Sequence, residues 1–257
     1  MKIYSWNMLY RNQELDRAFD FISKSDFDIF CLQEVPEEML ARLKALPFHI
    51  ASRIDTEKLS PAGSTPMYVV ILSRYPIEKQ GEIAFDDYRS LLPLRTRFFI
   101  RCMPNKFFTK ICNRGCVYAD ITVEGILFRI FCLHLVLAQP AWRLAEFERA
   151  MTNRDETRQT IVCGDFNILE APHITPLNWI LGGTLSDMFL YKRERTTIEK
   201  QFATYGLTNV LRGKVTHSIS HSQLDHILVP RASTIQKAAV LSDCVGSDHH
   251  PICVEIV

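Results

Sequence analysis

Short apolar runs of strand character recur along the whole chain, and several of them end in a small group of polar residues. The polar groups are Trp6-Asn7, Leu32-Gln33-Glu34, Leu133-His134, Gly164-Asp165-Phe166-Asn167, Leu224-Asp225-His226 and Gly246-Ser247-Asp248-His249. Polar side chains at the mouth of a buried strand stabilise a core poorly unless they are paired or exposed. They can converge, however, where several strands end at one rim. The pattern therefore predicts a layered domain with a polar site at one end of its strands.

Strands and helices are interleaved from end to end. The predicted strands cover 3–6, 28–33, 68–73, 77–84, 96–102, 117–123, 127–133, 160–163, 226–229, 237–241 and 252–256. Apolar residues with helical spacing predict helices over 14–25, 36–46, 142–151 and 174–181. Many strands with few helices favour an α+β fold, in which two mostly antiparallel sheets pack face to face with helices outside. We expect residues 1–257 to form a single domain.

Composition excludes several classes of protein. The net charge of +1 gives no global field that would attract nucleic acid or membrane, so a local patch must hold an anionic substrate. No apolar run approaches the roughly 20 residues of a membrane span. Because strand character begins at Lys2 and Asn7 already belongs to the polar set, we expect no signal peptide and a cytoplasmic location. Cys112 and Cys116 have near-metal spacing, but no second Cys/His pair accompanies them, and a zinc site is not expected.

Carboxylates at strand ends favour a hard metal ion. Glu34 ends a buried strand, and magnesium takes oxygen ligands, often from only one or two protein carboxylates. The structural alternative for Glu34 is an acid at the start of a helix. Asp165 and Asn167 follow another buried strand, where the alternative is an Asx turn that closes it.

Two histidines complete the polar set. His134 ends a strand, a position that is more often structural than catalytic, whereas His249 is flanked by Asp248. A carboxylate such as Asp225 beside His249 would orient the ring and favour its charged form. The sequence contains no nucleophile elbow, phosphate-binding loop or dinucleotide fingerprint. Metal-assisted attack of water on a phosphate ester fits these residue types best.

The ordered set of motifs resembles the endonuclease/exonuclease/phosphatase superfamily. The resemblance rests on Trp6-Asn7, Gln33-Glu34, His134-Leu135, Gly164-Asp165-Phe166-Asn167, Leu224-Asp225-His226-Ile227 and Ser247-Asp248-His249-His250-Pro251. Each motif is moderately specific, and together they cover nearly the whole chain. The resemblance implies a four-layer αββα sandwich and a magnesium-dependent phosphodiesterase or phosphatase, with manganese as a substitute ion. The position two residues after Asn7 is Leu9, which argues against an abasic-site endonuclease.

The resemblance also implies roles for individual residues. Glu34 and Asn7 would hold the metal, with Asp248 completing the environment of the metal or of the histidine. Asp165, helped by Asn167, would position or deprotonate the attacking water. His134 and His249 would bind the phosphate, and Asp225 would orient His249. Arg143 falls where an arginine often follows the histidine strand, and it is a candidate contact to the substrate.

Substrate choice depends on the segment 89–114, which is rich in basic and aromatic residues and contains no acid. Such a segment can bind single-stranded nucleic acid or an anionic membrane surface, and Arg97, Arg101 and Lys106 are its candidate contacts. The structural alternative is a strand pair with one solvated basic face. We expect a nuclease-type phosphodiesterase acting on DNA or a DNA adduct. The alternatives are a phospholipid or phosphoinositide phosphoesterase and an inactive, family-shaped binding protein, and the sequence indicates no protein partner.

Overall fold

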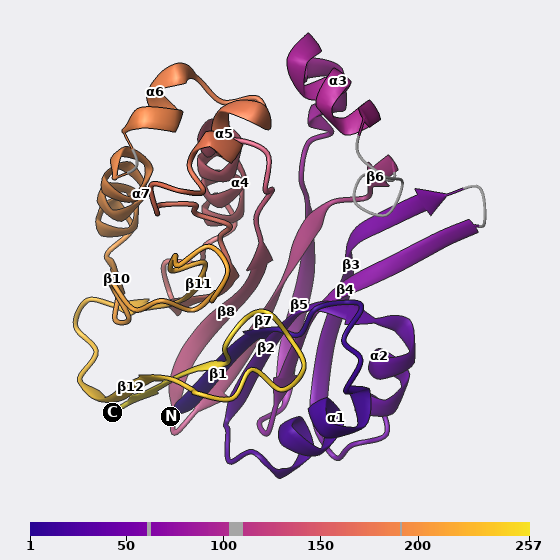
Figure 1. The fold of residues 1–257 in the computed structure, drawn as a ribbon. Helices are drawn as coiled ribbons and strands as arrows, with labels where there is room; N and C mark the ends of the chain where they lie inside the picture. Colours follow the sequence, from indigo (N-terminus) through magenta and orange to yellow (C-terminus); the bar gives the residue numbers. More distant parts are fainter. Residues whose placement is uncertain (61–62, 103–109, 191) are drawn as a thin grey trace.

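Two β-sheets lie face to face at the centre of the protein, and helices cover their outer surfaces (Figure 1). The structure, a computed structural model, describes residues 1–60, 63–102, 110–190 and 192–257. Within these ranges, none of the helices combines the length and apolar character that a membrane span requires.

Each sheet is mixed but mostly antiparallel. The strands of the first sheet, in spatial order, are β12 (Ile235–Val240), β13 (Ile252–Ile256), β1 (Lys2–Asn7), β2 (Ile29–Pro36), β4 (Gly63–Ser73), β3 (His49–Ser60) and β6 (Lys110–Cys112). Those of the second are β10 (Leu207–Asn209), β11 (Asp225–Pro230), β9 (Gln159–Asp165), β8 (Ile126–His134), β7 (Gly115–Val123) and β5 (Ile77–Ala84). The pairs β1–β2 and β8–β9 are parallel, and the others are antiparallel.

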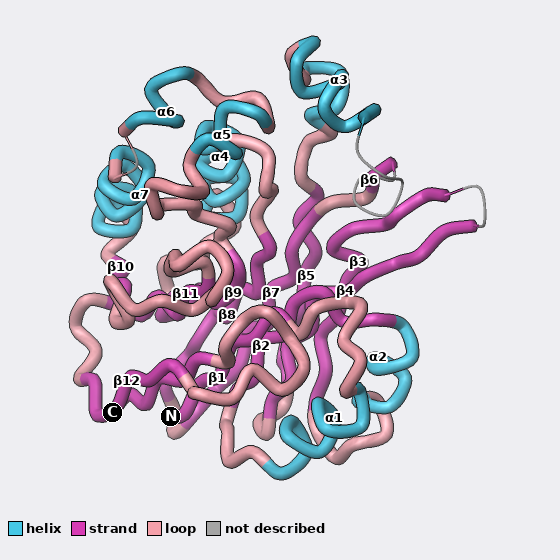
Figure 2. The backbone as a smooth tube through the Cα atoms, viewed as in Figure 1, coloured by secondary structure: helices cyan, strands magenta, loops and turns pink. Residues whose placement is uncertain are grey.

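The helices divide between the two outer faces and one end of the sandwich (Figure 2). On the first sheet lie α1 (Leu15–Lys24) and α2 (Glu37–Leu43), and on the second lie α4 (Pro140–Met151) and α7 (Arg193–Thr204). Grouped at one end are the 3-10 turn η1 (Tyr88–Leu91) and the helices α3 (Leu94–Cys102), α5 (Pro176–Ile180) and α6 (Leu185–Phe189).

Alternation of apolar side chains along β2 explains the layers. Ile29 and Cys31 point into the core between the two sheets, whereas Phe30 and Leu32 pack in the core beneath α1 and α2. A strand that is apolar on both faces has this period because successive side chains point to opposite sides. The predicted α+β fold, a four-layer αββα sandwich, is confirmed.

One predicted strand, 96–102, is wrong, because these residues form helix α3. Aromatic and β-branched residues in this segment favour a strand locally, but tertiary contacts decide the structure. The Thr96 hydroxyl donates to the carbonyl of Ile180 at 2.8 Å, and Arg95 Nη2 donates to the carbonyl of Gly183 at 2.5 Å. These bonds fix the segment against α5. Strands β3, β6 and β10 and helices α6 and α7 have no counterpart among the predicted elements.

Candidate active site

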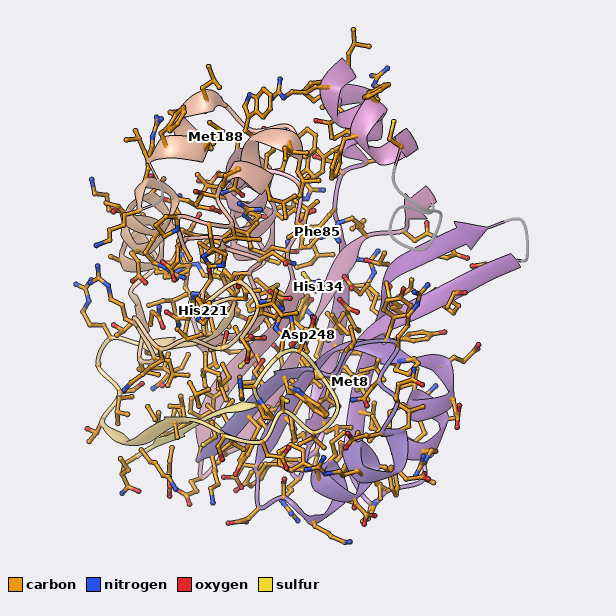
Figure 3. The ribbon with its side chains drawn as sticks, viewed as in Figure 1. Met8, Phe85, His134, Met188, His221 and Asp248 are labelled. Carbon is orange, nitrogen blue, oxygen red and sulfur yellow. The ribbon has the colours of Figure 1, made fainter. Side chains whose placement is uncertain are left out.

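The polar residues predicted from the sequence meet where strands of both sheets end. Asn7, His134 and Asp165 are the last residues of β1, β8 and β9, and Asp225 is the first residue of β11. In the second sheet, Asp165 pairs with His134 on one side and with Asp225 on the other. Figure 3 labels His134 and Asp248 near one another in the middle of the view.

Two β-bulges against β4 place two further carboxylates. The register between β2 and β4 shifts between Leu32 and Val35, and Glu34 there has a φ of 53°. The register between β3 and β4 shifts between Ile54 and Thr56, which places the bulge at Asp55. A bulge re-aims side chains out of the strict alternation of a strand. Glu34 and Asp55 thereby come to lie on either side of His134.

His134 and Asp55 form the first of two buried histidine–carboxylate pairs. His134 Nδ1 lies 2.5 Å from Asp55 Oδ2, and its Nε2 lies 3.7 Å from Asp165 Oδ2 and 3.9 Å from Glu34 Oε1. Burial opposes the charged form of the ring. The charge and hydrogen bond of Asp55, followed by the charges of Asp165 and Glu34, outweigh it and raise the pKa of His134 to about 9. The ring is therefore an imidazolium at neutral pH.

His249 and Asp225 form the second pair. His249 Nδ1 lies 2.9 Å from Asp225 Oδ2, and its Nε2 lies 3.7 Å from Asp165 Oδ2. Burial again opposes the charge, but the carboxylates of Asp225 and Asp165 raise the pKa of His249 to about 10. Burial raises the pKa of Asp225. Both cationic rings thus point an Nε2 atom at the same oxygen of Asp165.

Asp165 is held as a carboxylate between the two rings. Burial opposes its ionisation, but the charges of His249 and His134 and the donors around it lower its pKa. Its oxygens accept hydrogen bonds from Asn7 Nδ2 at 3.0 Å and from the Asn167 amide at 2.8 Å. The preceding Gly164 has a φ of 147°, and a Cβ there would lie 1.9 Å from a backbone carbonyl of β8. Only glycine fits this close approach.

Two asparagines hold the carboxylates and the backbone beside them. Asn7 Nδ2 bridges Asp165 and Glu34, whose Oε1 lies 3.3 Å away, and Asn7 Oδ1 accepts a hydrogen bond from the Leu9 amide. Asn167 has a φ of 52°, and its Nδ2 donates to the carbonyl of Leu135. In this arrangement Asn7 links the two acids, and Asn167 fixes the turn after β9.

Asp248 receives a hydrogen bond from His217, a residue that the sequence did not indicate. His217 Nδ1 accepts a hydrogen bond from the Ser220 amide at 3.1 Å, so in the neutral ring the proton lies on Nε2. That Nε2 lies 3.4 Å from Asp248 Oδ2. Burial opposes ionisation of Asp248, but the His217 hydrogen bond and the charge of His249 lower its pKa. Asp248 Oδ1 is buried and has no hydrogen-bond partner among the described residues.

The residues of this site suit a divalent cation. Two groups of side chains converge closely enough to hold an ion, namely Asp165, Asp225 and His249, and His217, Asp248 and His249. Because the His249 ring is protonated at neutral pH, the atoms that these groups would offer to an ion are the carboxylate oxygens of Asp165, Asp225 and Asp248. A buried oxygen without a partner, such as Asp248 Oδ1, needs a ligand to satisfy it. Carboxylate oxygens are also the ligands that magnesium and manganese prefer. The donors therefore fit the ion that the sequence predicted.

Arg114 belongs to the basic segment 89–114, but its side chain contacts the backbone of the site. It is partly buried, donates from Nη2 to the carbonyl of His134 at 2.8 Å and pairs with Glu146 at 3.0 Å. Neither Arg114 nor Asp55 can be recognised as part of the site without the strand pairing, because the first lies at the end of a basic segment and the second at a bulge.

The four predicted substrate contacts lie in different environments, and two of them lie partly or wholly outside the described residues. Arg143 is fully buried, with Nε 2.5 Å from Glu194 and Nη2 2.9 Å from Asn178 Oδ1, so it joins α4 to neighbouring elements. The prediction that it contacts substrate is therefore wrong. Arg97 is exposed on α3. The side chain of Arg101 and the whole of Lys106 lie outside the described residues.

Comparisons with known proteins agree with this geometry. The family model described as the Endonuclease/Exonuclease/phosphatase family matches residues 4–249. A search of curated protein sequences finds no match.

Solved structures share the fold at low sequence identity. A family protein from Leptotrichia buccalis C-1013-b has a TM-score of 0.67 at 14% identity, with 100% of this chain and 99% of that chain covered. A mannosyl-6-phosphatase from Bacteroides thetaiotaomicron VPI-5482 has a TM-score of 0.64 at 17% identity, with the same coverage. A 3′ phosphatase from Neisseria, bound to a product DNA hairpin, has a TM-score of 0.57 at 19% identity, again with the same coverage. These likenesses show the fold.

Proposed function

Because the chain belongs to the endonuclease/exonuclease/phosphatase family, we propose that it hydrolyses a phosphate ester with an activated water molecule and a divalent cation. One observation carries the proposal. Two buried imidazolium rings, each backed by its own carboxylate, point their Nε2 atoms at one oxygen of Asp165 from 3.7 Å. A centre with two fixed cations facing one fixed anion suits a reaction in which a phosphate gains negative charge beside an attacking water.

The histidines would bind and stabilise the phosphate. With their pKa values raised to about 9 and about 10, His134 and His249 are charged donors at neutral pH. Their Nδ1 atoms are held by Asp55 and Asp225, so each ring keeps its orientation without reorganising during the reaction. The Nε2 atoms would donate to the oxygens of the phosphate.

Asp165 would act on the water. Its lowered pKa keeps it ionised, so it can accept a hydrogen bond from the nucleophile and orient it. Asn7 and the Asn167 amide hold the carboxylate in place. A divalent cation in this site supplies Lewis acidity at the phosphate and lowers the pKa of bound water. We propose that the carboxylates of Glu34 and Asp248 hold it, with Asn7 beside Glu34 to orient that carboxylate.

We propose DNA or a DNA adduct as the substrate, on the support of the basic, acid-free segment 89–114. The Neisseria 3′ phosphatase, whose fold this chain shares, binds a DNA hairpin. A phospholipid is the second candidate, because the surface of α3 and α6 exposes large apolar side chains that nucleic acid does not need. A small phosphorylated metabolite would use the same chemistry, as the mannosyl-6-phosphatase neighbour illustrates.

Metal dependence tests the proposal directly. The purified chain should hydrolyse at least one member of a panel of nicked and single-stranded DNA, 5′-tyrosyl DNA, sphingomyelin and phosphoinositides, and excess chelator should abolish the activity. Glu34→Gln should remove most of kcat and leave the melting temperature nearly unchanged, because Gln can keep the contact with Asn7. Glu78→Gln, at an exposed carboxylate on β5, is the matched control and should retain full activity.

Two outcomes would contradict the proposal. Full activity in excess chelator would exclude the metal mechanism. Substrate binding without turnover, under every divalent ion tried, would favour a binding protein built on this fold.

A further inference from the structure

Helices α3 and α6, at one end of the molecule, and the residues beside them display apolar side chains to solvent. We name this surface the apolar rim. It consists of Leu91, Leu94, Phe98, Leu185, Phe189 and Leu190. Leu94 is 82% exposed, Phe98 70% and Phe189 68%. Scattered exposed apolar residues are ordinary, but a gathering of large ones marks an interaction surface.

The exposure follows from how α3 and α6 are attached. Thr96 and Arg95 bind the backbone around α5, which turns that side of α3 inward. Leu91 ends the turn η1, and Leu94 and Phe98 are four residues apart on α3, the spacing of one helical face; all three are exposed. In α6, Leu185 and Phe189 are four residues apart, and none of the residues of this helix is buried. Figure 1 shows α3 and α6 projecting at the same end of the protein.

Basic residues accompany the apolar ones. Among the described residues of α3, Arg95 and Arg97 are exposed cations, and the helix contains no Asp or Glu. Arg97 lies next to Phe98 and is exposed on the same helix. A surface that combines large apolar groups with cations is complementary to the boundary between acyl chains and anionic headgroups.

Packing connects the rim to the loop that follows His134. The chain leaves His134 and reaches α4 through residues 135–139, and Gln139 approaches the turn at Gly182 that also faces Pro93 and Thr96. A surface held by α3 and α6 is thus connected by packing to the loop that follows His134.

We propose that the apolar rim docks on the surface of an anionic lipid membrane. Leucine side chains cannot stack on nucleobases, so most of the rim would gain nothing from single-stranded nucleic acid, which binds through aromatic platforms. A symmetric contact between two copies would bring two acid-free, basic segments together, and their like charges oppose it. A membrane instead buries the leucines and attracts the arginines. The proposal concerns binding and stands apart from catalysis, although a lipid substrate would use both.

Flotation with vesicles tests the proposal on the full chain in chelator, so that hydrolysis plays no part. The parent should partition onto phosphatidylcholine vesicles that contain about 30% phosphatidylserine, and high salt should weaken the binding. Leu94→Ser combined with Phe98→Ser should lower the partition coefficient at least about tenfold, because two exposed apolar anchors are lost. Leu185→Ser combined with Phe189→Ser should have a similar effect.

Ile126→Ser combined with Leu127→Ser is the matched control. These residues are 45% and 39% exposed and begin β8, the strand that ends at His134, so they lie roughly 26 Å from the site. The control should bind vesicles like the parent. A parent that stays unbound at low salt, or a control that loses as much binding as the rim variants, would overturn the proposal.

Two further measurements test the two alternative occupants of the rim, a single-stranded nucleic acid and a second copy of the chain. If the rim variants keep vesicle binding but lose binding to a single-stranded oligonucleotide, the surface serves nucleic acid and the proposal fails. If they convert a dimer into a monomer on sizing chromatography and leave vesicle binding unchanged, the surface joins two copies and the proposal also fails. Activity of the rim variants on a soluble phosphoester reports on the catalytic site separately.

Discussion

Replacing Asp55 with asparagine should lower activity at neutral pH and restore much of it in acid. The carboxylate lies 2.5 Å from His134 Nδ1 and, against the opposing effect of burial, provides the largest contribution that raises the pKa of that ring to about 9. The amide side chain of the Asp55→Asn variant would still offer an oxygen to Nδ1, but without a charge. The pKa of His134 should therefore fall to about 6.5 or below.

The size of the effect follows from the two pKa values. At about pH 7.5, a ring with a pKa near 9 is roughly 97% protonated, whereas one with a pKa near 6.5 is roughly 9% protonated. If phosphate binding requires the imidazolium, kcat/KM should drop about tenfold at this pH from protonation alone. At about pH 5.5 the ring of the variant is again roughly nine-tenths protonated, and that part of the loss should disappear.

The Asp55→Asn substitution should also lower the stability of the fold, independently of its effect on activity. Asp55 Oδ1 is buried without a hydrogen-bond partner among the described residues, so the amide nitrogen of asparagine could be left unsatisfied there. We expect a loss of about 1–3 kcal/mol in the free energy of unfolding. Asp120→Asn is the control, because Asp120 is also buried and pairs with Arg129 at 2.7 Å, in β7 and β8. It should lose stability without changing the pH profile.

The assay is kcat/KM from about pH 5.5 to 9 at saturating metal, with the imidazole titration followed by NMR. An Asp55→Asn profile parallel to that of the parent over this range would refute the reasoning. It would show that the charge of Asp55 does not keep His134 protonated.

Three other perturbations test neighbouring parts of the site. Gly164→Ala should destabilise the fold by several kcal/mol in denaturant titrations, because the φ of 147° is strained for alanine and its Cβ would meet backbone. His217→Phe keeps a ring but removes the hydrogen bond to Asp248, and it should weaken manganese binding about tenfold in calorimetry. In the metal-free protein, the pKa values of His134 and His249 lie above the ordinary 6.5, so their stabilisation is complete below about pH 6.5 and is lost as pH rises through about 9 to 10. The melting temperature should fall over that interval.

The residues at strand ends could be predicted from the sequence, because the end of an apolar run marks the end of a strand. His134 and Asp165 each close an apolar run, and parallel pairing of β8 with β9 sets them side by side. Asp55 could not be predicted, since a bulge depends on the register with β4, which no local pattern reveals. His217 lies in a loop, and only the fold brings it to Asp248.

Long-range contacts also explain the two errors. The segment 96–102 has the composition of a strand, but hydrogen bonds to the backbone around α5 hold it as a helix. Arg143 lies at the position in the order of motifs where a substrate contact was expected, yet it is enclosed by Glu194 and Asn178. A sequence position shows which element a side chain belongs to, but the partners of that side chain decide whether it is free.

Unusual backbone conformations also help to build the site. Of the seven non-glycine residues with positive φ in the described part of the chain, Glu34 and Asn167 belong to the site, and Leu9 and Val245 lie within a few residues of Asn7 and Asp248. Such conformations cost free energy and persist only where surrounding structure enforces them. In this protein, the strand pairing and the apolar cores on either side of each sheet hold these residues in their conformations. The rigid sandwich therefore does more than carry the polar residues, because it holds the backbone turns that aim their carboxylates at one point.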